Sequence, residues 1–330
     1  METMLCRVAD SLFWMSRYLE RAENTARLVD VNLQLLLDSD SADVGDAIAY
    51  WTPILSSLGD AGLFEDLYEE MNNQNVEEFL ILNRENPSSA FSCVVAAREN
   101  ARMVRDQISE EMWEVINRLY HYLKRYAGSR FAGQNMQDVF THIKEASSLF
   151  VGVTESTYPH QIGYEFIKAG RYLERAEKVG RIIESSQRWV DTANRDAVAL
   201  THWVAALRAC SGSAAYQRAY HGDIESEHVL NLLLSSREFP RSMLFSLSRL
   251  QLAIHAISGC PLSHYSNEAE RLCGRLISDL NYTSTTELIE RGVQSFLERA
   301  RNEIEAIALK LSQKYMFFPV VDTTATTETE

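Results

Sequence analysis

Apolar side chains recur every three to four residues along the first forty positions of the chain. On a helical wheel of about 100° per residue they form one stripe, made of Val8, Met15, Leu19, Ala22, Ala26, Val29 and Leu33. This period predicts an amphipathic helix over about residues 3–37. The opposite side carries a group of charged residues, which we call the charged window, and on that side Phe13 precedes it and Leu28 follows it. Because apolar residues lie at both ends of this group, we expect other helices to enclose the charges partly.

The charged window contains a sequence that the chain uses twice. Residues 17–23, Arg-Tyr-Leu-Glu-Arg-Ala-Glu, return letter for letter at 171–177. Helical period continues around the second copy, and Pro159 suits the first turn of a helix. We therefore expect a second long helix from Pro159 to about Val190.

Further landmarks repeat in the same order, which predicts an internal duplication. The matched pairs are Trp51 with Trp203, Tyr68 with Tyr220, Pro87 with Pro240, and Ser89 with Ser242. Two copies are too few for a solenoid, whose repeats bury one another's faces. We expect an all-α, multi-helix bundle of two similar halves, residues 1–155 and 156–318, packed as one globular body.

No useful alternating pattern predicts a strand. Other helices are expected at about 46–57, 62–71, 75–83 and 136–150, with one long helix from Pro87 to about Tyr126. A third, partial copy at Leu297 to Ala300 is interpreted as ordinary amphipathic helix. Residues 319–330 are polar apart from Pro319, Val320, Val321 and Ala325, and are expected to form a disordered tail.

The motif places like charges four residues apart on one helical face. Arg17 and Arg21 repel each other, and the second copy repeats the conflict as Arg171 and Arg175. An acid should lie between the guanidinium groups of each pair. It could be a carboxylate from another helix, which would make a buried Arg/Glu network that fixes helix register. The alternative is an anionic ligand held bidentately.

Three more arginines have the same two interpretations. Arg98 and Arg102 share a helical face, so they could bridge to the motif glutamates or line a cationic pocket for a carboxylate or phosphate. Arg241 follows Pro240 just before a predicted helix, where backbone N–H groups favour an anion. The simpler interpretation of Arg241 is a surface residue of the first turn.

The amino-acid composition limits the classes of partner that the chain is expected to bind. The chain has 46 acidic and 32 basic residues, and its net charge of −14 argues against unspecific nucleic-acid binding and against anionic membranes. No run of about 18 apolar residues and no signal peptide is apparent. Five scattered cysteines without a Cys-x-x-Cys pair suggest reduced thiols in a cytoplasmic protein.

No cofactor or metal is predicted. The glycine-rich phosphate motifs of nucleotide-binding folds are absent, and so is any recognisable catalytic triad. One Glu-x-x-His, Glu225 to His228, has no second copy, whereas a di-iron bundle needs two. His221 and His228 are therefore expected to cap or flank a surface helix.

From about Met4 to Pro319 the chain resembles the alpha-E domain family, bacterial helical proteins named for a Glu-Arg motif. The resemblance rests on residues 9–15, 86–89, 97–102, 170–176 and 239–242. It implies no established activity or catalytic residues. Genes of this family typically neighbour, or are fused to, those of circularly permuted ATP-grasp ligases, often with a transglutaminase-like protease nearby.

We therefore expect a helical partner of an ATP-grasp-type amide or peptide ligase system. It would position a carboxylate-bearing or peptide substrate, and it could also meet the transglutaminase-like protein. One alternative is an enzyme of amide-bond chemistry in which Glu20 or Glu174 is the general base. Another is a purely structural interaction scaffold.

Overall fold

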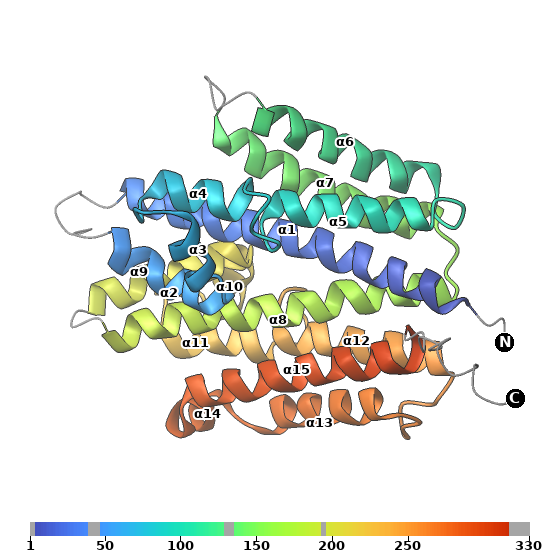
Figure 1. Ribbon diagram of the computed structural model, residues 1–330. Coiled ribbons are helices and arrows are strands. Elements are labelled where there is room, and N and C mark those ends of the chain that lie inside the picture. Colours follow the sequence, from blue (N-terminus) through green and yellow to red (C-terminus); the bar gives the residue numbers. More distant parts are fainter. Residues whose placement is uncertain (1–3, 39–46, 129–134, 193–195, 317–330) are drawn as a thin grey trace, which may run out of the picture.

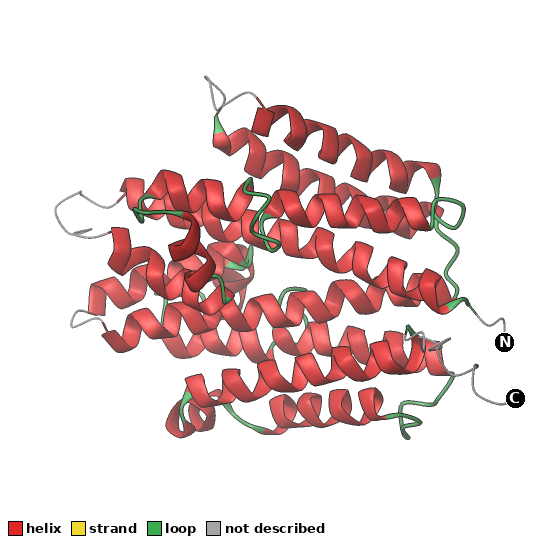
Figure 2. Cartoon of the chain, in the orientation of Figure 1, coloured by secondary structure: helices red, strands yellow, loops and turns green. Residues whose placement is uncertain are grey.

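The computed structural model describes residues 4–38, 47–128, 135–192 and 196–316, and within these ranges it contains helices and no strand (Figure 2). The all-α class is thus confirmed. The first-half helices are α1 Cys6–Asp38, α2 Ala47–Leu58, α3 Ala61–Leu67, α4 Asn73–Ile81, α5 Ala90–Met103, α6 Glu110–Gly128 and α7 Met136–Thr157.

The second half follows a similar order. Its helices are α8 Ile162–Thr192, α9 Asp196–Ala209, α10 Ser213–Tyr220, α11 Ser226–Leu230, α12 Met243–Ser258, α13 Glu268–Tyr282, α14 Thr285–Arg291 and α15 Val293–Tyr315. A single π-helical turn, Asn231–Ser235, extends α11. The expected tail, 319–330, lies outside the described residues.

The two motif helices, α1 and α8, lie side by side in the middle of the bundle and run in the same direction (Figure 1). On the first side, α5 packs along α1, and α6 and α7 complete the layer. On the second side, α12 packs along α8, and α13 and α15 occupy the corresponding places. This is the arrangement that two similar halves would adopt; the duplication itself stays a prediction.

Backbone contact between α1 and α8 is unusually close at one glycine. A Cβ atom added to Gly170 would lie 2.2 Å from the carbonyl oxygen of Phe13 and 3.3 Å from Cγ of Arg17. Any larger residue would therefore push the helices apart. This approach lies next to the second motif copy, so it brings the charged side chains of the two helices within reach of each other.

The enclosure of the charged window is confirmed. Met15, Leu19 and Val29 of the apolar stripe are buried, and so are Phe13 and Leu28 on the opposite side. The buried set also includes polar residues of the motif, namely Arg17, Glu20, Glu23 and Asn24. Such burial requires each charge to be paired or strongly hydrogen-bonded.

The single long helix expected from Pro87 to Tyr126 is wrong, because the chain turns back at residues 104–109 between α5 and α6. Ser109 accepts a hydrogen bond from the backbone N–H of Met112 at 3.2 Å, as a helix N-cap does. Glu110 and Glu111 then lie in the first turn of α6, where acidic side chains favour a helix start.

Other predicted boundaries shift by a few residues. Helix α7 continues to Thr157 rather than 150, and α8 begins at Ile162, with Pro159 in the turn before it. All five cysteines are free, and Cys93, Cys210 and Cys273 are buried. Among the described helices, none has the length and apolarity required to traverse a bilayer.

Candidate functional site

Two matched ion pairs join the motif helices. Arg21 donates from Nε to Oε1 of Glu174 at 2.6 Å and from Nη2 to Oε2 at 3.0 Å. Arg175 repeats this on Glu20, at 2.7 and 2.9 Å. Both carboxylates are almost completely buried. The bidentate geometry belongs to the stronger class of hydrogen bonds, so these pairs fix the register of α1 against α8.

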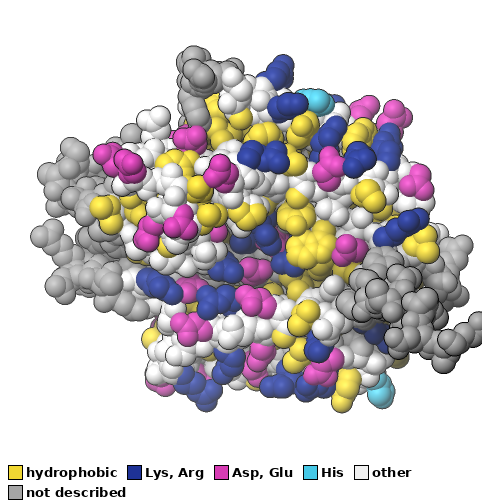
Figure 3. Space-filling model, in the orientation of Figure 1, with side chains coloured by type: hydrophobic (Ala, Val, Ile, Leu, Met, Phe, Trp, Pro, Cys, Tyr) yellow, Lys and Arg dark blue, Asp and Glu magenta, His cyan; other side chains and the backbone are white. Residues whose placement is uncertain are grey.

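A second row of glutamates pairs within each helix. Glu23 accepts from Nε of Arg27 at 2.8 Å, and Glu177 accepts from Nε of Arg181 at 3.1 Å. These are the i,i+4 pairs that the sequence predicts, with the acid nearer the N-terminus. Figure 3 shows basic and acidic side chains gathered over the middle of one face, where α1 and α8 lie.

The first arginines of the two motif copies have different surroundings. Arg17 donates from Nε to Glu174 at 2.9 Å and from Nη2 to Glu177 at 3.3 Å. Arg171 is only 9% exposed, yet within the described part of the chain it has no carboxylate partner. Its Nε has no hydrogen-bond partner, its Nη2 reaches the Tyr172 hydroxyl at 3.4 Å, and its guanidinium lies 4.8 Å from that ring's centre.

Arg241 explains why Arg171 lacks an acid. Its side chain, from the turn before α12, pairs with Glu23, donates to Oδ1 of Asn24 at 3.0 Å and lies 3.7 Å from Glu20. The other oxygen of Glu23 accepts from the Ser147 hydroxyl at 2.7 Å. The carboxylates that an equivalent of Arg17 would contact are thus occupied. Arg241 is an interhelical residue rather than a surface one.

Near Glu174, a lysine supplies the additional positive charge that Arg241 supplies near Glu20. Lys178 stands where the first motif copy has Asn24, and its Nζ lies 3.8 Å from Oε1 of Glu174. Lys178 is buried, and this burial lowers its pKa, although Glu174 and Glu177 oppose that shift. Glu174 therefore has three cations close to it, Arg17, Arg21 and Lys178, whereas Glu20 has Arg175 and, from the turn before α12, Arg241.

The motif glutamates stay ionised. Burial opposes the charge of Glu20, but the guanidinium groups of Arg175, Arg241 and Arg171 outweigh it and hold its pKa at about 2. Burial likewise opposes the charge of Glu174, and the cations around it hold its pKa well below the ordinary range. Both oxygens of each carboxylate already accept hydrogen bonds.

Arg98 and Arg102 do not join the motif layer. Arg98 donates to Oδ1 of Asn117 at 2.8 Å and lies over the ring of Tyr120, whereas the largely exposed Arg102 pairs with Glu99. The expected bridges from this face to the motif glutamates are therefore wrong. The buried side of α5 carries small alanines instead, and the arginine face turns toward α6 and solvent.

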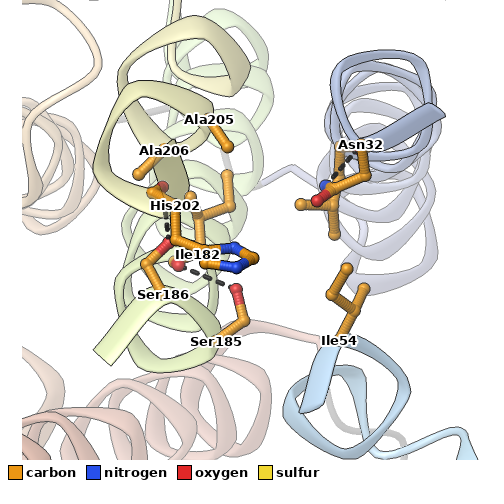
Figure 4. A pocket seen from close by; sticks show the side chains of 9 residues that line it. Asn32, Ile54, Ile182, Ser185, Ser186, His202, Ala205 and Ala206 are labelled. Carbon is orange, nitrogen blue, oxygen red and sulfur yellow. Dashed lines mark hydrogen bonds between the residues drawn. The ribbon is translucent and has the colours of Figure 1, made fainter. Parts of the chain in front are cut away.

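Of the two histidines named from sequence, His221 caps a helix, as predicted, whereas His228 lies inside α11. His221 is the C-cap of α10 in a left-handed conformation, and His228 stacks on Tyr220. Sequence reasoning missed another histidine, His202, which lines a cavity between α1, α2, α8 and α9 together with Asn32, Ser185 and Ser186 (Figure 4). Burial lowers the pKa of His202 to about 4.

That cavity is too small for a substrate. Its volume, measured for the centres of water-sized spheres, is about 10 Å³. This is near the minimum for one water molecule. The candidate site developed below is the Arg/Glu layer between α1 and α8, with Arg171 at its edge.

These features define an all-helical protein whose two central helices exchange buried Glu-Arg pairs. The chain belongs to the Alpha-E family, described as a predicted alpha-helical domain with a conserved ER motif, whose model matches residues 4–316. In this chain the repeated Glu-Arg dipeptides are Glu20-Arg21 and Glu174-Arg175. Their side chains form the two bidentate pairs.

The curated relatives are longer proteins. An uncharacterized protein of Mycobacterium bovis is 24% identical over 311 residues, which cover 86% of this chain and 33% of the relative. Uncharacterized proteins of Mycobacterium tuberculosis match at the same identity and coverage. The chain thus spans about a third of the length of these relatives. No solved structure matches it.

Proposed function

We propose that this chain is a non-catalytic helical partner of an ATP-grasp-type amide or peptide ligase system, and that it positions a carboxylate-bearing or peptide substrate. The observation that carries the proposal is the buried Arg171, whose guanidinium lacks the acid that its counterpart Arg17 has. A guanidinium matches a carboxylate in two-point geometry. Arg171 is accordingly the motif residue available to an external acid.

The state of the motif glutamates argues against the enzymatic alternative. A general base works best when its pKa is near the operating pH and a lone pair faces the proton to be removed. Glu20 has a pKa of about 2, and both its oxygens accept bonds from Arg175. Glu174 is engaged in the same way by Arg21. Their chemistry is that of structural counter-ions.

The length of the relatives supports a role beside another protein. In the mycobacterial proteins the matched region is about a third of the chain, so the helical domain there is one part of a larger molecule. A module that is covalently attached in one protein can act as a separate partner in another. The ligase class itself comes from the family resemblance.

Arg17 and Arg171 offer a matched pair of variants for the test. In Arg17→Met, Glu174 loses a buried partner, so the melting temperature should fall. In Arg171→Met no carboxylate is stranded, so stability should be kept or raised. Both variants would be expressed with an affinity tag in the native host and purified with their partners.

The purified complexes would be assayed for ATP-dependent ligation, with mass spectrometry of the products. We expect Arg171→Met to lose ligation while keeping its fold and its partner. Full ligation by Arg171→Met would refute the positioning role and favour a structural scaffold. Turnover by the isolated chain would instead support the enzymatic alternative.

A further inference from the structure

A second group of chemically active side chains lies away from the motif helices. It comprises His255 in the last turn of α12, Cys260 in the following loop, and Glu270 in the first turn of α13. One ligand atom of each residue lies within 4.8 Å of the other two. In Figure 1 the loop joining α12 and α13 lies at the end of the bundle that also holds the N-terminus of α1.

Helix ends bring these three residues together. Gly259 closes α12 in a left-handed conformation, with φ of +74°, and its N–H donates to the carbonyl of His255 at 2.9 Å. This turn sends the chain back beside the helix, so that Cys260 faces His255. Asn267 then caps α13 and sets Glu270 in its first turn.

The hydrogen bonds of His255 fix its tautomer. Nδ1 lies 3.0 Å from the carbonyl oxygen of Cys260. A carbonyl only accepts, so Nδ1 carries the proton and Nε2 keeps a lone pair. A histidine that binds a metal through one nitrogen characteristically donates the other N–H to a carbonyl or carboxylate. His255 is thus prepared to be a ligand.

Glu270 is also held in place. Its Oε2 accepts the backbone N–H of Ser266 at 2.5 Å, and its Oε1 accepts from Nδ2 of Asn267 at 2.7 Å. The Ser266 hydroxyl lies 3.1–3.2 Å from both oxygens. These bonds resemble a capping box, which by itself explains the carboxylate. The capping box accounts for Glu270 alone. The Gly259 turn and the bond from Nδ1 to the Cys260 carbonyl place the imidazole and the thiol beside Glu270, and the thiol donates to the carbonyl of Pro261 at 3.7 Å.

We propose that His255, Cys260 and Glu270 bind a divalent transition metal ion, for which Zn²⁺ is the best match. Zinc accepts nitrogen, sulfur and oxygen ligands in tetrahedral geometry, and three protein ligands leave a fourth position for water or an external ligand. A thiolate and a carboxylate would together neutralise the charge of the ion. This inference is independent of the proposed partner function.

To bind an ion, the three ligand atoms would have to move only slightly closer to one another. Zn–N and Zn–S distances of about 2.0 and 2.3 Å place tetrahedral ligand atoms about 3.5 Å apart, so the donors must approach by about 1 Å from the present limit of 4.8 Å. Cys260 is partly exposed, and Leu262 and Tyr265 of the same loop are exposed. The loop can therefore adjust, and an ion can reach the site.

The test uses the full chain, stripped of metal by a chelator and then titrated with Co²⁺ as a visible probe and with Zn²⁺ as competitor. We expect one equivalent to bind with a thiolate-to-cobalt charge-transfer band, which Zn²⁺ removes. Cys260→Ser should abolish the band. Cys6→Ser is the matched control, because Cys6 is also a partly exposed free thiol, and it should keep the band.

His255→Ala and Glu270→Gln test the other ligands. Each should weaken cobalt binding at least about tenfold, since even outer-shell changes at metal sites cost about 10- to 100-fold. Glu270→Gln keeps an oxygen that can accept the helix-capping bonds, and circular dichroism would verify the fold of every variant. The proposal is overturned if no charge-transfer band forms, or if Cys260→Ser binds cobalt as tightly as the native chain.

Discussion

Gly170 gives the sharpest test of how the motif helices are held together. Replacing glycine by alanine inside a helix ordinarily stabilises it by about 1 kcal/mol, because glycine has the larger conformational entropy to lose. At Gly170 the new methyl group would instead be placed 2.2 Å from the backbone oxygen of Phe13. An ordinary contact begins near 3.4 Å. Neither backbone can yield without moving its helix.

The magnitude follows from two opposing contributions. Overpacking of a tight interior costs about 1–3 kcal/mol, and occasionally more. The helix-propensity gain of about 1 kcal/mol offsets part of that. Separating α1 from α8 would also stretch the buried pairs Arg21–Glu174 and Arg175–Glu20, whose rupture is strongly destabilising. We expect Gly170→Ala to lower the free energy of unfolding by about 2 kcal/mol or more.

The assay is urea-induced unfolding followed by circular dichroism. Gly152→Ala is the matched control, since Gly152 lies inside α7 and an added Cβ meets no atom within 4 Å. That variant should be as stable as the native chain or up to about 1 kcal/mol more stable. If Gly170→Ala behaved like Gly152→Ala, the close approach of α1 and α8 would be refuted.

Three further outcomes are expected. Ala22 is fully buried in the stripe of α1, so Ala22→Leu should cost about 1–3 kcal/mol, and an unchanged melting temperature would count against a tight crossing. Glu174→Gln should cost about 3–5 kcal/mol because it removes the buried carboxylate that Arg17 and Arg21 share, whereas the exposed Glu99→Gln should stay within about 0.5 kcal/mol. For His202, whose folded pKa of about 4 is below the ordinary value of 6.5, stability is fully present above pH 6.5. It should fall by about 1.4 kcal/mol per pH unit toward pH 4 as the unfolded histidine takes up a proton. His202→Gln should flatten that part of a urea-unfolding series; an equal slope in the variant would show that another group is responsible.

Local pattern was enough for much of the fold. The helical period located α1 and α8, and the spacing of Glu23 and Arg27 predicted their i,i+4 pair. The break between α5 and α6 was missed because apolar period continues through buried Val104 and Ile108 in the turn. Ser109, followed by two glutamates, is a typical helix N-cap, and this local preference outweighs the helical spacing of the apolar residues at that point.

The partners of the motif arginines could not be derived from one helix. The sequence required an acid between Arg17 and Arg21, but the choice of Glu174 depends on the parallel packing of α1 and α8. The docking of Arg241 on Glu23 joins residues more than two hundred positions apart. Contacts of this kind depend on how distant helices pack together, so the spacing of residues along one helix does not predict them.

The two motif copies have the same sequence but different surroundings, and the different surroundings are more informative about function. Glu174 is neutralised from Arg17, Arg21 and Lys178, all on the two central helices, whereas Glu20 draws on Arg175 and on Arg241 beside α12. The use of Arg241 ties α12 to α1, and Arg171 has no carboxylate within ion-pair distance among the residues that the structure describes.

A buried guanidinium with no carboxylate in contact is costly, even though Arg171 helps to hold the pKa of Glu20 down, and an apolar side chain of similar length would fill its position without that cost. Register between α1 and α8 does not require Arg171, because the two bidentate pairs already supply it. An acid from outside the chain, as we propose, would give that guanidinium the close partner that it lacks among the described residues. A carboxylate bound there would complete on the second side the pairing that Glu174 and Glu177 give Arg17 on the first.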